Sequence, residues 1–417
     1  MPTLLSLPPE ILIQICNEIP HLDHGPWVYK WMACVPGFII TLTRLVKTCR
    51  LLRQVAEPIL YRDTFTGGEY WPLFRTLLTR KDLASHVKSF TMGEFDYEEK
   101  MEPSQEEREA VKGLIRQLSH NADGSIRSSA PEWLMNDPFQ HDTEDYECSS
   151  EDPIDAFFLA LSLLILPKLE SLCFISSWCI EENTFLPNSL QSLTELSFSH
   201  SDTEGSMGLD EINAFLRAAP NLRVLRGHMV GDASDVSRHE GIREVHLTYS
   251  GLEAKGLIDL MNSFPFLEVF TYESGGAIVT ESYDEAVPRE FTDALLCRKN
   301  TLRHVVIDLS NSCEISDGLL ARDTLQSLQA MEVLEILAVD SPTICPTRRE
   351  SIPEGDLIIN ILPRSIKSFS IRGPNPLIHN DILQLAEVAK TRFPNLNHVD
   401  FSGYDNLKLN EAFVFNE

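Results

Sequence analysis

The chain has 417 residues, with 62 Asp and Glu against 35 Lys and Arg, so its formal net charge at pH 7 is -27. Such a charge repels phosphate backbones and anionic lipid, which argues against non-specific binding to nucleic acid or to a membrane surface. A cationic protein partner fits this charge better. Apolar residues make up 43% of the chain, so most of it is expected to be globular.

The nine cysteines are scattered along the chain, and no two of them form a Cys-x-x-Cys pair. We interpret them as buried thiols in a reducing compartment and expect neither disulfides nor a zinc site. The N-terminus has no basic segment ahead of an apolar core, which argues against a signal peptide. The most apolar run, 31–46, contains Pro36 and Arg44 and is too short to cross a bilayer. These features predict a cytoplasmic or nuclear protein.

Two helices are predicted in the first sixty residues. In LSLPPEILIQICNEI, Pro8 and Pro9 lie near the first turn, and apolar residues follow at helical spacing. The segment TLTRLVKTCRLLRQVAEPILYR is predicted to be a second, single helix that Pro58 ends. Its basic residues, which lie largely opposite its apolar side, are Arg44, Lys47, Arg50 and Arg53. One interpretation is that these two helices only cover the exposed end of an array of repeats that follows them in the chain.

The same segments contain Leu-Pro-x-Glu-Ile-Leu at 7–12, Lys-Thr-Cys-Arg-Leu-Leu-Arg at 47–53 and Pro-Ile-Leu-Tyr-Arg at 58–62. This combination closely resembles the F-box, especially as it occurs in fungal proteins. The resemblance implies a three-helix domain over residues 1–62 that binds the Skp-type adaptor of a cullin ubiquitin ligase. Carried over by position, the adaptor-binding residues are Leu7, Pro8, Ile11, Leu12, Ile15, Leu45, Val46 and Leu52.

The chain departs from the F-box pattern at 20–41, where about twenty residues interrupt what is normally a short link. The inserted loop puts the helix register in doubt, although it could also enlarge the contact. Residues 1–62 carry six Lys and Arg against four Asp and Glu, so this end is mildly basic within an acidic chain. The Skp-type adaptors that bind F-box proteins are acidic, so a basic N-terminal region agrees with the resemblance.

The hydrophobic pattern is less regular in the part of the chain that follows residue 62. Residues 71–78 have helical spacing, and HVKSFTM from His86 is expected to form the first, degenerate repeat strand. Residues 94–155 hold 18 Asp and Glu against five Lys and Arg. Within them we predict a helix over 103–118 and a mobile acidic loop over 119–151, so that an insertion spans about 96–152. The loop is interpreted as a solvated segment; a phosphorylated or partner-binding segment around Ser149 and Ser150 is the alternative.

From residue 167 onward, nine segments share the pattern apolar, two variable, apolar, one variable, apolar, as in APNLRVLRGH and FPNLNHVDFSG. The second apolar residue falls at 172, 196, 225, 245, 270, 305, 337, 369 and 399, in steps of 20 to 35 residues. This pattern is typical of leucine-rich-repeat strands, and the steps suit one strand plus one returning helix. We predict an α/β fold: a leucine-rich-repeat solenoid with parallel strands and return helices over 63–417, preceded by a small all-α F-box-like domain.

The return helices are predicted in the segments that start at Leu209, Gly251, Val287 and His379. Another helix starts at Pro153 and is expected to pack five apolar side chains inward, namely Phe157, Phe158, Leu161, Leu164 and Ile165. Loops are predicted near residue 205 and at 231–239, 275–284 and 341–355.

Outward residues flank the inward pair of each strand, because successive strand side chains alternate between the two faces. In a curved solenoid they line the concave side, where they could recognise a target protein. The candidate target-binding residues are Arg226, His228, Glu244, His246, Thr271, Glu273, His304, Asp308, Asp340, Arg372, His398 and Asp400. Any single one of them could equally be an ordinary solvent-facing residue, so the row as a whole is the stronger candidate.

No catalytic or cofactor motif is found: Gly-x-x-x-x-Gly-Lys-Ser/Thr, Gly-x-Ser-x-Gly and His-Glu-x-x-His are all missing from the chain. We therefore expect a non-catalytic protein without a cofactor or metal. With the F-box resemblance, the repeats predict a substrate-recognition subunit of a Skp/cullin/F-box ubiquitin ligase that holds an unknown protein target. The alternative is a leucine-rich-repeat interaction scaffold that acts outside any ligase.

Overall fold

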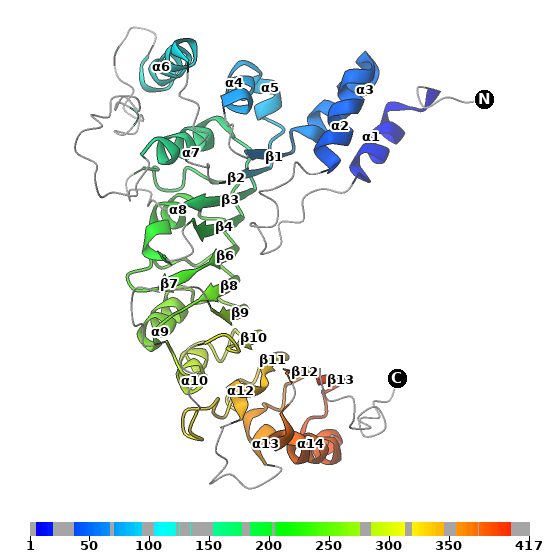
Figure 1. Ribbon diagram of the computed structural model, residues 1–417, viewed down its shortest axis with the longest axis vertical. Helices are drawn as coiled ribbons and strands as arrows, with labels where there is room; N and C mark the ends of the chain where they lie inside the picture. Colours follow the sequence, from blue (N-terminus) through cyan, green and yellow to red (C-terminus); the bar gives the residue numbers. More distant parts are fainter. Residues whose placement is uncertain are drawn as a thin grey trace. The chain divides into compact units, whose positions relative to one another are not determined.

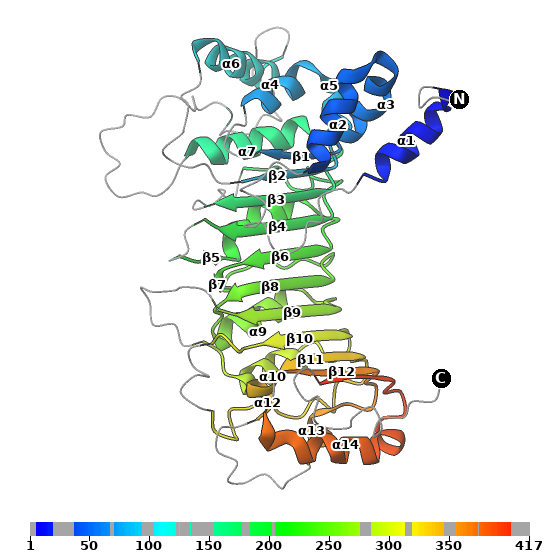
Figure 2. The same ribbon diagram turned by 45° about the vertical axis from the view of Figure 1, so that its right-hand side comes forward.

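The computed structural model describes residues 6–19, 37–66, 71–93, 104–121, 125, 134, 153–176, 184–201, 205–275, 285–312, 319–345, 356–373 and 375–401. They form two compact units, the first with residues 1–201 and 217–221, the second with residues 202–216 and 222–417. The protein is mixed α/β, and of the eleven strands of its main parallel sheet four belong to the first unit and seven to the second (Figures 1 and 2). This architecture is compatible with a parallel α/β solenoid. Among the described residues, no helix has the length and apolar character that crossing a membrane requires.

Three helices begin the first unit: α1 (Pro9–Asn17), α2 (Gly37–Thr48) and α3 (Arg50–Leu60). The single helix predicted from Thr41 to Pro58 is wrong, because Cys49 has an extended backbone with φ -158 and ψ 167. A continuous helix would hold Leu42 and Ile59 about 25 Å apart at 1.5 Å per residue, whereas the break lets both enter one core. Tertiary packing therefore decides the break.

Two details of the sequence-based boundaries also need correction. Pro58 lies inside α3, which continues to Leu60 instead of ending at the proline. The predicted link at 20–41 is partly helical, since α2 begins at Gly37, and residues 20–36 lie outside the described residues. The buried core of the three helices is Leu12, Cys16, Leu42, Leu52, Val55, Ala56 and Ile59.

The sheet of the first unit has the order β1 (Asp63–Thr66), β2 (Ser89–Met92), β3 (Ser171–Ser176) and β4 (Glu195–His200). Its pairs are parallel, and Phe90, Leu172 and Leu196 are aligned in one row. The expected strand at His86 is confirmed as β2. Strand β1 was not predicted, because its four residues carry no repeat pattern.

Four further helices of this unit are α4 (Trp71–Thr79), α5 (Lys81–Ala84), α6 (Gln105–Ser119) and α7 (Pro153–Ile165). The helices expected over 71–78 and 103–118 are confirmed. Most of the expected acidic loop lies outside the described residues. In α7, Phe158 packs edge-on against Phe74 at 5.4 Å, but Leu164 is 38% exposed and does not pack inward as expected. Because α7 is apolar all round, its sequence did not specify the buried face.

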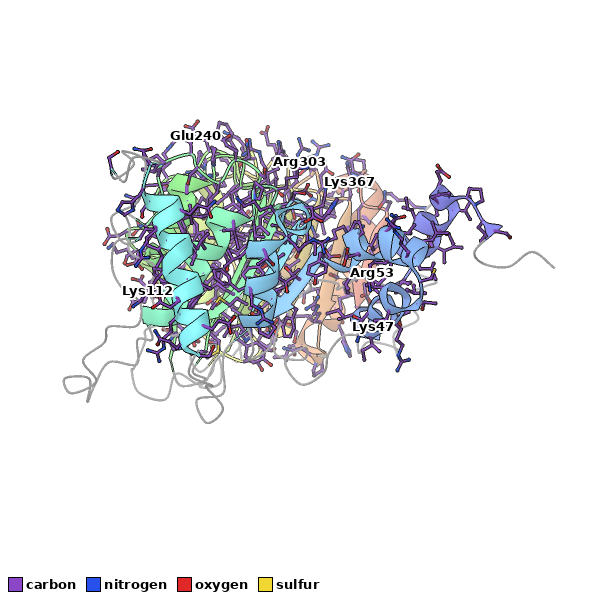
Figure 3. All side chains as sticks on the ribbon, turned by 90° about the horizontal axis from the view of Figure 1, so that it is seen from above. Lys47, Arg53, Lys112, Glu240, Arg303 and Lys367 are labelled. Atoms are coloured by element: carbon purple, nitrogen blue, oxygen red, sulfur yellow. The ribbon has the colours of Figure 1, made fainter. Side chains whose placement is uncertain are left out.

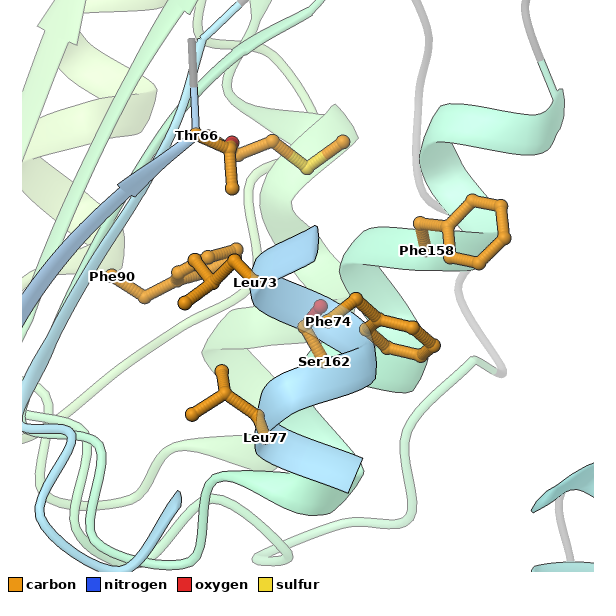
Figure 4. Close-up of a pocket in the computed structure, with 8 residues that line it drawn as sticks. Thr66, Leu73, Phe74, Leu77, Phe90, Phe158 and Ser162 are labelled. Carbon is orange, nitrogen blue, oxygen red and sulfur yellow. The ribbon is translucent and has the colours of Figure 1, made fainter. Parts of the chain in front are cut away.

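A small pocket lies between α4, α7 and the strands β1 and β2 (Figure 4). Its lining is almost entirely apolar, and its volume of about 10 Å³ is about the space of one water molecule. The lining residues are Thr66, Leu73, Phe74, Leu77, Phe90, Met92, Phe158 and Ser162. A space of this size holds no cofactor or substrate, so we interpret it as a packing defect of the core.

The seven main strands of the second unit follow the predicted repeats. They are β6 (Val224–His228), β8 (Glu244–Ser250), β9 (Val269–Ser274), β10 (His304–Asp308), β11 (Ile336–Asp340), β12 (Ser368–Arg372) and β13 (His398–Phe401). Adjacent strands are parallel, and the second apolar residues of the repeats pair directly with one another, for example Val245 with Phe270 and Phe270 with Val305. All of these except Val399 on the last strand are buried. The predicted strand positions are therefore confirmed.

The return helices of the second unit lie on one side of its strands (Figure 1). The expected positions are confirmed by η5 (Asp210–Ile212), α8 (Asn213–Ala218), α9 (Ala254–Ser263), α10 (Pro288–Leu296) and α14 (His379–Arg392). Of these, α8 has its last two residues in the first unit. A short helix that was not predicted, η6 (Pro376–Ile378), precedes α14.

The second unit also has elements where loops were expected. The segment predicted as a loop at 341–355 begins with α12 (Ser341–Ile344), and α13 (Leu357–Ile361) follows it. The segment near 231 begins with β7 (Val230–Asp232), which pairs with β5 (Met207–Gly208) in a small second sheet.

The buried hydroxyl of Tyr272 connects β9 to the chain that follows β8. It donates to the carbonyl oxygen of Ser250 at 2.7 Å and accepts from the amide of Leu252 at 2.9 Å. The pairing of β8 with β9 shifts register between Leu247 and Ser250, and Tyr249 there adopts a φ of 49°. The hydroxyl thus satisfies two backbone groups at the irregular end of β8.

Replacing Tyr272 with Phe should lower the free energy of unfolding by about 2–4 kcal/mol, because two buried backbone groups lose their partner. Urea denaturation measures this change. Tyr249→Phe removes the same hydroxyl from a side chain that is 37% exposed, so we expect a change within about 0.5 kcal/mol. Equal effects of the two substitutions would contradict the role of Tyr272.

Candidate interaction surfaces

Helix α1 has two apolar faces with different surroundings. Leu12 and Cys16 are buried in the core of the three helices. Ile11 and Ile15, one helical turn apart, remain 38% and 43% exposed and share one flank of the helix. Ile13, 42% exposed, points to the opposite flank. An apolar flank at Ile11 and Ile15 is therefore available to a partner.

The structure distributes the other predicted adaptor-binding residues over three environments. Pro8 is exposed just before α1, and Leu7 is half-buried against the helical core. Leu45 and Val46 of α2 are also half-buried against that core. Leu12 and Leu52 are 1% and 4% exposed, so they lie under the surface and support it from inside.

The basic residues of α2 and α3 lie on the surface, as the sequence predicted. Arg44, Lys47, Arg50 and Arg53 are all exposed, and Figure 3 shows Lys47 and Arg53 among them. The Nε of Arg53 donates to the carbonyl oxygen of Val46 at 3.3 Å and thereby satisfies an acceptor near the C-terminus of α2. The helices thus present cations next to partly exposed apolar side chains.

The second unit carries the predicted target-binding residues on the strand face opposite its return helices, which we call the open face. The strand register aligns these residues in three rows across the strands. The first row contains Glu244, His304 and His398, and the second contains Arg226, His246, Thr271 and Asp400. The third contains Glu273, Asp308, Asp340 and Arg372. His228 pairs with Thr248, just where the register of β8 with β9 shifts. Most of them are half-buried or exposed, whereas Asp340 is only 2% exposed.

Three histidines on the open face, His228, His246 and His304, are favoured in the neutral form. Burial lowers the pKa of His228 and of His304. For His246, burial and then the charge of Arg226 lower the pKa, although its Nε2 lies 3.5 Å from Oε2 of Glu244. Neutral imidazoles both donate and accept hydrogen bonds, so this part of the face suits polar recognition at neutral pH.

The third row is acidic on β9, β10 and β11. Burial, followed by the nearby charge of Asp308, raises the pKa of Glu273. Asp308 accepts a contact of 3.4 Å from the Nη1 of Arg372, whose side chain is 58% exposed. Oδ1 of Asp340 accepts hydrogen bonds from the amide of Leu309 at 3.1 Å and from the hydroxyl of Thr343.

Asp340 should make folding stability depend on pH. Burial raises the pKa of Asp340 from 3.8 to about 6, so the folded chain holds the proton more tightly than the unfolded chain does. Its contribution to stability is present below about pH 4 and is lost as the pH rises through about 6. The isosteric Asp340→Asn carries no such proton.

Between pH 5.0 and 7.5, wild type should lose about 1–2 kcal/mol more unfolding free energy than Asp340→Asn does. Urea denaturation at the two pH values measures both changes. Identical pH dependence in the two proteins would show that Asp340 has an ordinary pKa in the folded chain.

A ladder of ion pairs, which the sequence analysis did not identify, runs along the starts of the strands of the second unit. Glu335 accepts from Nη1 of Arg303 at 3.0 Å and from Nζ of Lys367 at 2.9 Å, and Arg243 lies 3.7 Å from Glu268. Figure 3 labels Arg303 and Lys367. The sequence contained a pattern that could have identified the ladder: each of these charged residues directly follows the first apolar residue of the recurring pattern and precedes a strand. Exposed pairs of this kind contribute less than about 1 kcal/mol each, so the ladder mainly favours the observed register.

Among the residues that the structure describes, no group of three or more His, Cys, Asp or Glu could hold a metal ion. No family model matches the chain, and a search of curated proteins finds no match to it. The candidate function therefore depends on the two surfaces themselves: the exposed flank of α1 and the open face of the second unit.

Proposed function

We propose that this protein is the substrate-recognition subunit of a Skp/cullin/F-box ubiquitin ligase, present in the cytoplasm or the nucleus. In this proposal the first three helices bind a Skp-type adaptor and, through it, a cullin, while the open face of the second unit holds a target protein. In this proposal the chain itself catalyses no reaction. Its contribution is proximity, because a bound target has a high local concentration near the transferring enzyme.

The observation that carries the proposal is the flank of α1. Ile11 and Ile15 remain exposed although Leu12 and Cys16, on the same two turns, are fully buried. The helix therefore has more apolar surface than its own core covers, and this surface begins within the Leu-Pro-x-Glu-Ile-Leu sequence that resembles the F-box. The exposed cations of α2 and α3 suit an acidic adaptor.

The direct test is capture of a purified Skp-type adaptor by the purified full-length chain, followed by size-exclusion chromatography. We expect a stable one-to-one complex that forms more slowly as the salt concentration rises, because the cations steer association. Leu7→Asp combined with Pro8→Ala should abolish the complex. If the wild-type chain and the adaptor elute separately at micromolar concentrations, the proposal is wrong.

An interaction scaffold outside any ligase is a second candidate, favoured by how the helices connect to the sheet. The chain passes from α3 through Tyr61 and Arg62 directly into β1. Arg80 contacts both Glu57 of α3 at 3.2 Å and Asp82 of α5 at 2.6 Å. These connections are what a structural cap of the array would need.

Deleting residues 1–62 distinguishes the two candidates. If the helices are a docking module, the remaining chain should stay folded and keep its target binding while losing the adaptor. If they are only a cap, the deletion should expose the apolar edge and lead to aggregation. Circular dichroism and size-exclusion chromatography of the shortened chain give the answer.

A further inference from the structure

The charges of the second unit are unevenly distributed between the two ends of its strands. The segments that lead into β10, β11, β12 and β13 hold seven Lys and Arg against two Glu, and these segments are residues 297–303, 329–335, 362–367 and 390–397. In contrast, Glu273, Asp308 and Asp340 lie at the other ends of β9, β10 and β11. Although the chain has a net charge of -27, the starts of its last four strands are therefore locally basic.

Five exposed cations of these segments form a surface that we call the basic rim. Adjacent strands are about 4.8 Å apart, so the rim extends over about 14 Å from β10 to β13. It borders the open face at the ends where the strands begin. The members of the basic rim are Lys299, Arg303, Arg364, Lys367 and Arg392.

Two cations at the middle of the rim share one carboxylate. Glu335 accepts from Nη1 of Arg303 at 3.0 Å through Oε1 and from Nζ of Lys367 at 2.9 Å through Oε2. Figure 3 shows Arg303 and Lys367 on the same edge of the second unit. Their side chains are 54% and 50% exposed, and arginine has five N–H donors and lysine three. One excess positive charge and several donors thus remain for a partner.

The other three cations of the rim, Lys299, Arg364 and Arg392, form no ion pair with the residues that the structure describes. Their segments contain one further carboxylate, that of Glu332, which is exposed. The turn of Glu332 is next to that of Arg364, because the hydroxyl of Ser365 donates to the carbonyl oxygen of Leu334 at 2.7 Å. Even so, Glu332 and Arg364 do not pair. The rim therefore keeps positive charge that its own acids do not neutralise.

An exposed apolar side chain lies beside the rim. Ile336 directly follows Glu335 as the first residue of β11 and is 36% exposed. It pairs with His304 on one side and with Ser368 on the other, in the first row of the open face. A partner that contacts this region can therefore combine ion pairs with burial of an apolar side chain, as protein interfaces commonly do.

The surroundings of the rim favour a polypeptide over a nucleic acid. The net charge of the chain repels a long phosphate backbone. Glu332 and Glu335 lie among the cations, and Ile336 suits an apolar side chain better than a phosphate. An extended peptide rises about 3.3 Å per residue, so four to five residues would span the rim. A short acidic segment matches these dimensions.

We propose that the basic rim binds an acidic segment of the target protein, with an apolar residue of that segment against Ile336. This inference rests on the proposed function for the meaning of target and adds the chemistry by which the target is recognised. Glu335 is the internal anion with which the carboxylates of the target compete. The net charge of the whole chain predicts a cationic partner, but charges within about 10 Å dominate at a contact, so the segment held here is acidic.

The probe for this site is a library of random twelve-residue peptides displayed on phage and selected on the immobilised full-length protein at physiological salt. We expect the selected peptides to share two or more Asp or Glu within five consecutive positions, next to an apolar residue. Fluorescence anisotropy with a labelled synthetic copy measures the affinity. Replacing its Asp and Glu with Asn and Gln keeps the shape and should weaken binding about tenfold or more.

Charge-matched variants separate the rim from the overall field of the chain. Arg364→Gln with Arg392→Gln removes two cations that stabilise no ion pair, and it should weaken binding of the selected peptide about tenfold. Lys255→Gln with Arg289→Gln removes the same charge from exposed positions in the first turns of α9 and α10. Return helices begin near the other ends of the strands, so this control should change binding less than about twofold.

Removing the internal anion should have the opposite effect. Glu335→Gln frees Arg303 and Lys367, so the selected peptide should bind about threefold more tightly. Glu253→Gln makes the same change of charge at an exposed position just before α9 and should leave binding within about twofold. Unchanged or weaker binding by Glu335→Gln would overturn the competition between Glu335 and the target.

The inference is overturned if no peptide is selected, if the selected peptides lack acidic positions, or if the two cation-neutralised pairs bind equally. A single strand of twelve thymidine nucleotides is measured in parallel. If this strand binds more tightly than the selected peptide and loses its binding in Arg364→Gln with Arg392→Gln, the rim is a nucleic-acid site and the inference is wrong.

Adaptor capture by the same variants keeps this result separate from the proposed function. Loss of selectivity for acidic peptides with intact adaptor capture refutes only the role of the basic rim. Failure of adaptor capture with acidic-peptide binding retained refutes only the ligase assignment.

Discussion

Ile11→Asp combined with Ile15→Asp should lower the affinity for a Skp-type adaptor more than about 100-fold, which corresponds to about 3 kcal/mol. Both side chains are exposed on one flank of α1, so each carboxylate would enter a contact that the partner covers. Burying an unpaired charge in such a contact is costly. Isothermal titration calorimetry with the purified adaptor measures the loss.

The same helix provides the control. Ile13→Asp makes an identical chemical change at a side chain that is 42% exposed on the opposite flank, so affinity should stay within about threefold. Far-ultraviolet circular dichroism should be unchanged for both variants, because neither flank belongs to the buried core. Equal losses for the two variants would mean that α1 does not bind through the flank at Ile11 and Ile15.

Phe270→Ala should lower the free energy of unfolding of the second unit by about 3–5 kcal/mol. Phe270 is fully buried and pairs with Val245 on one side and Val305 on the other, so it lies within the continuous apolar row of the repeats. Because β9 lies between β8 and β10, a cavity at this position weakens the contacts of three strands. Urea denaturation and hydrogen exchange of β8, β9 and β10 measure the effect.

Phe266→Ala is the matched control for this substitution. Its ring is 46% exposed and contacts the guanidinium of Arg243 at 5.1 Å. Removing it should cost about 0.5–1 kcal/mol, the size of an exposed cation–π contact. If both substitutions cost the same, the row of second apolar residues is not the main source of stability in this unit.

The recurring strand pattern shows how far the sequence could be interpreted. The nine predicted strands are all present, because alternation of apolar residues identifies a strand and its recurrence identifies the partners on either side. In the described residues, Leu225, Val245 and Phe270 pair as the pattern requires. The open face followed from the same alternation, since the residues between two inward side chains must point outward.

Other features could not be predicted because they depend on contacts between distant segments. Periodicity continued through Cys49, and only the need to bring Leu42 and Ile59 into one core shows why the helix breaks there. The apolar sequence of α7 left the exposure of Leu164 undetermined. The first strand, β1, has no pattern of its own and is defined by its pairing with β2.

For the two candidate surfaces, too, some features follow from the sequence and others only from the tertiary structure. By itself the sequence determined which residues alternate, which strands are neighbours and where the first helix begins, because these depend on local spacing. Only the tertiary structure decided that Ile11 and Ile15 are exposed while Leu12 and Leu52 are buried. It also decided that Asp340 leaves a shielded oxygen beside Asp308. Burial is set by what packs against a residue, and that information lies elsewhere in the chain.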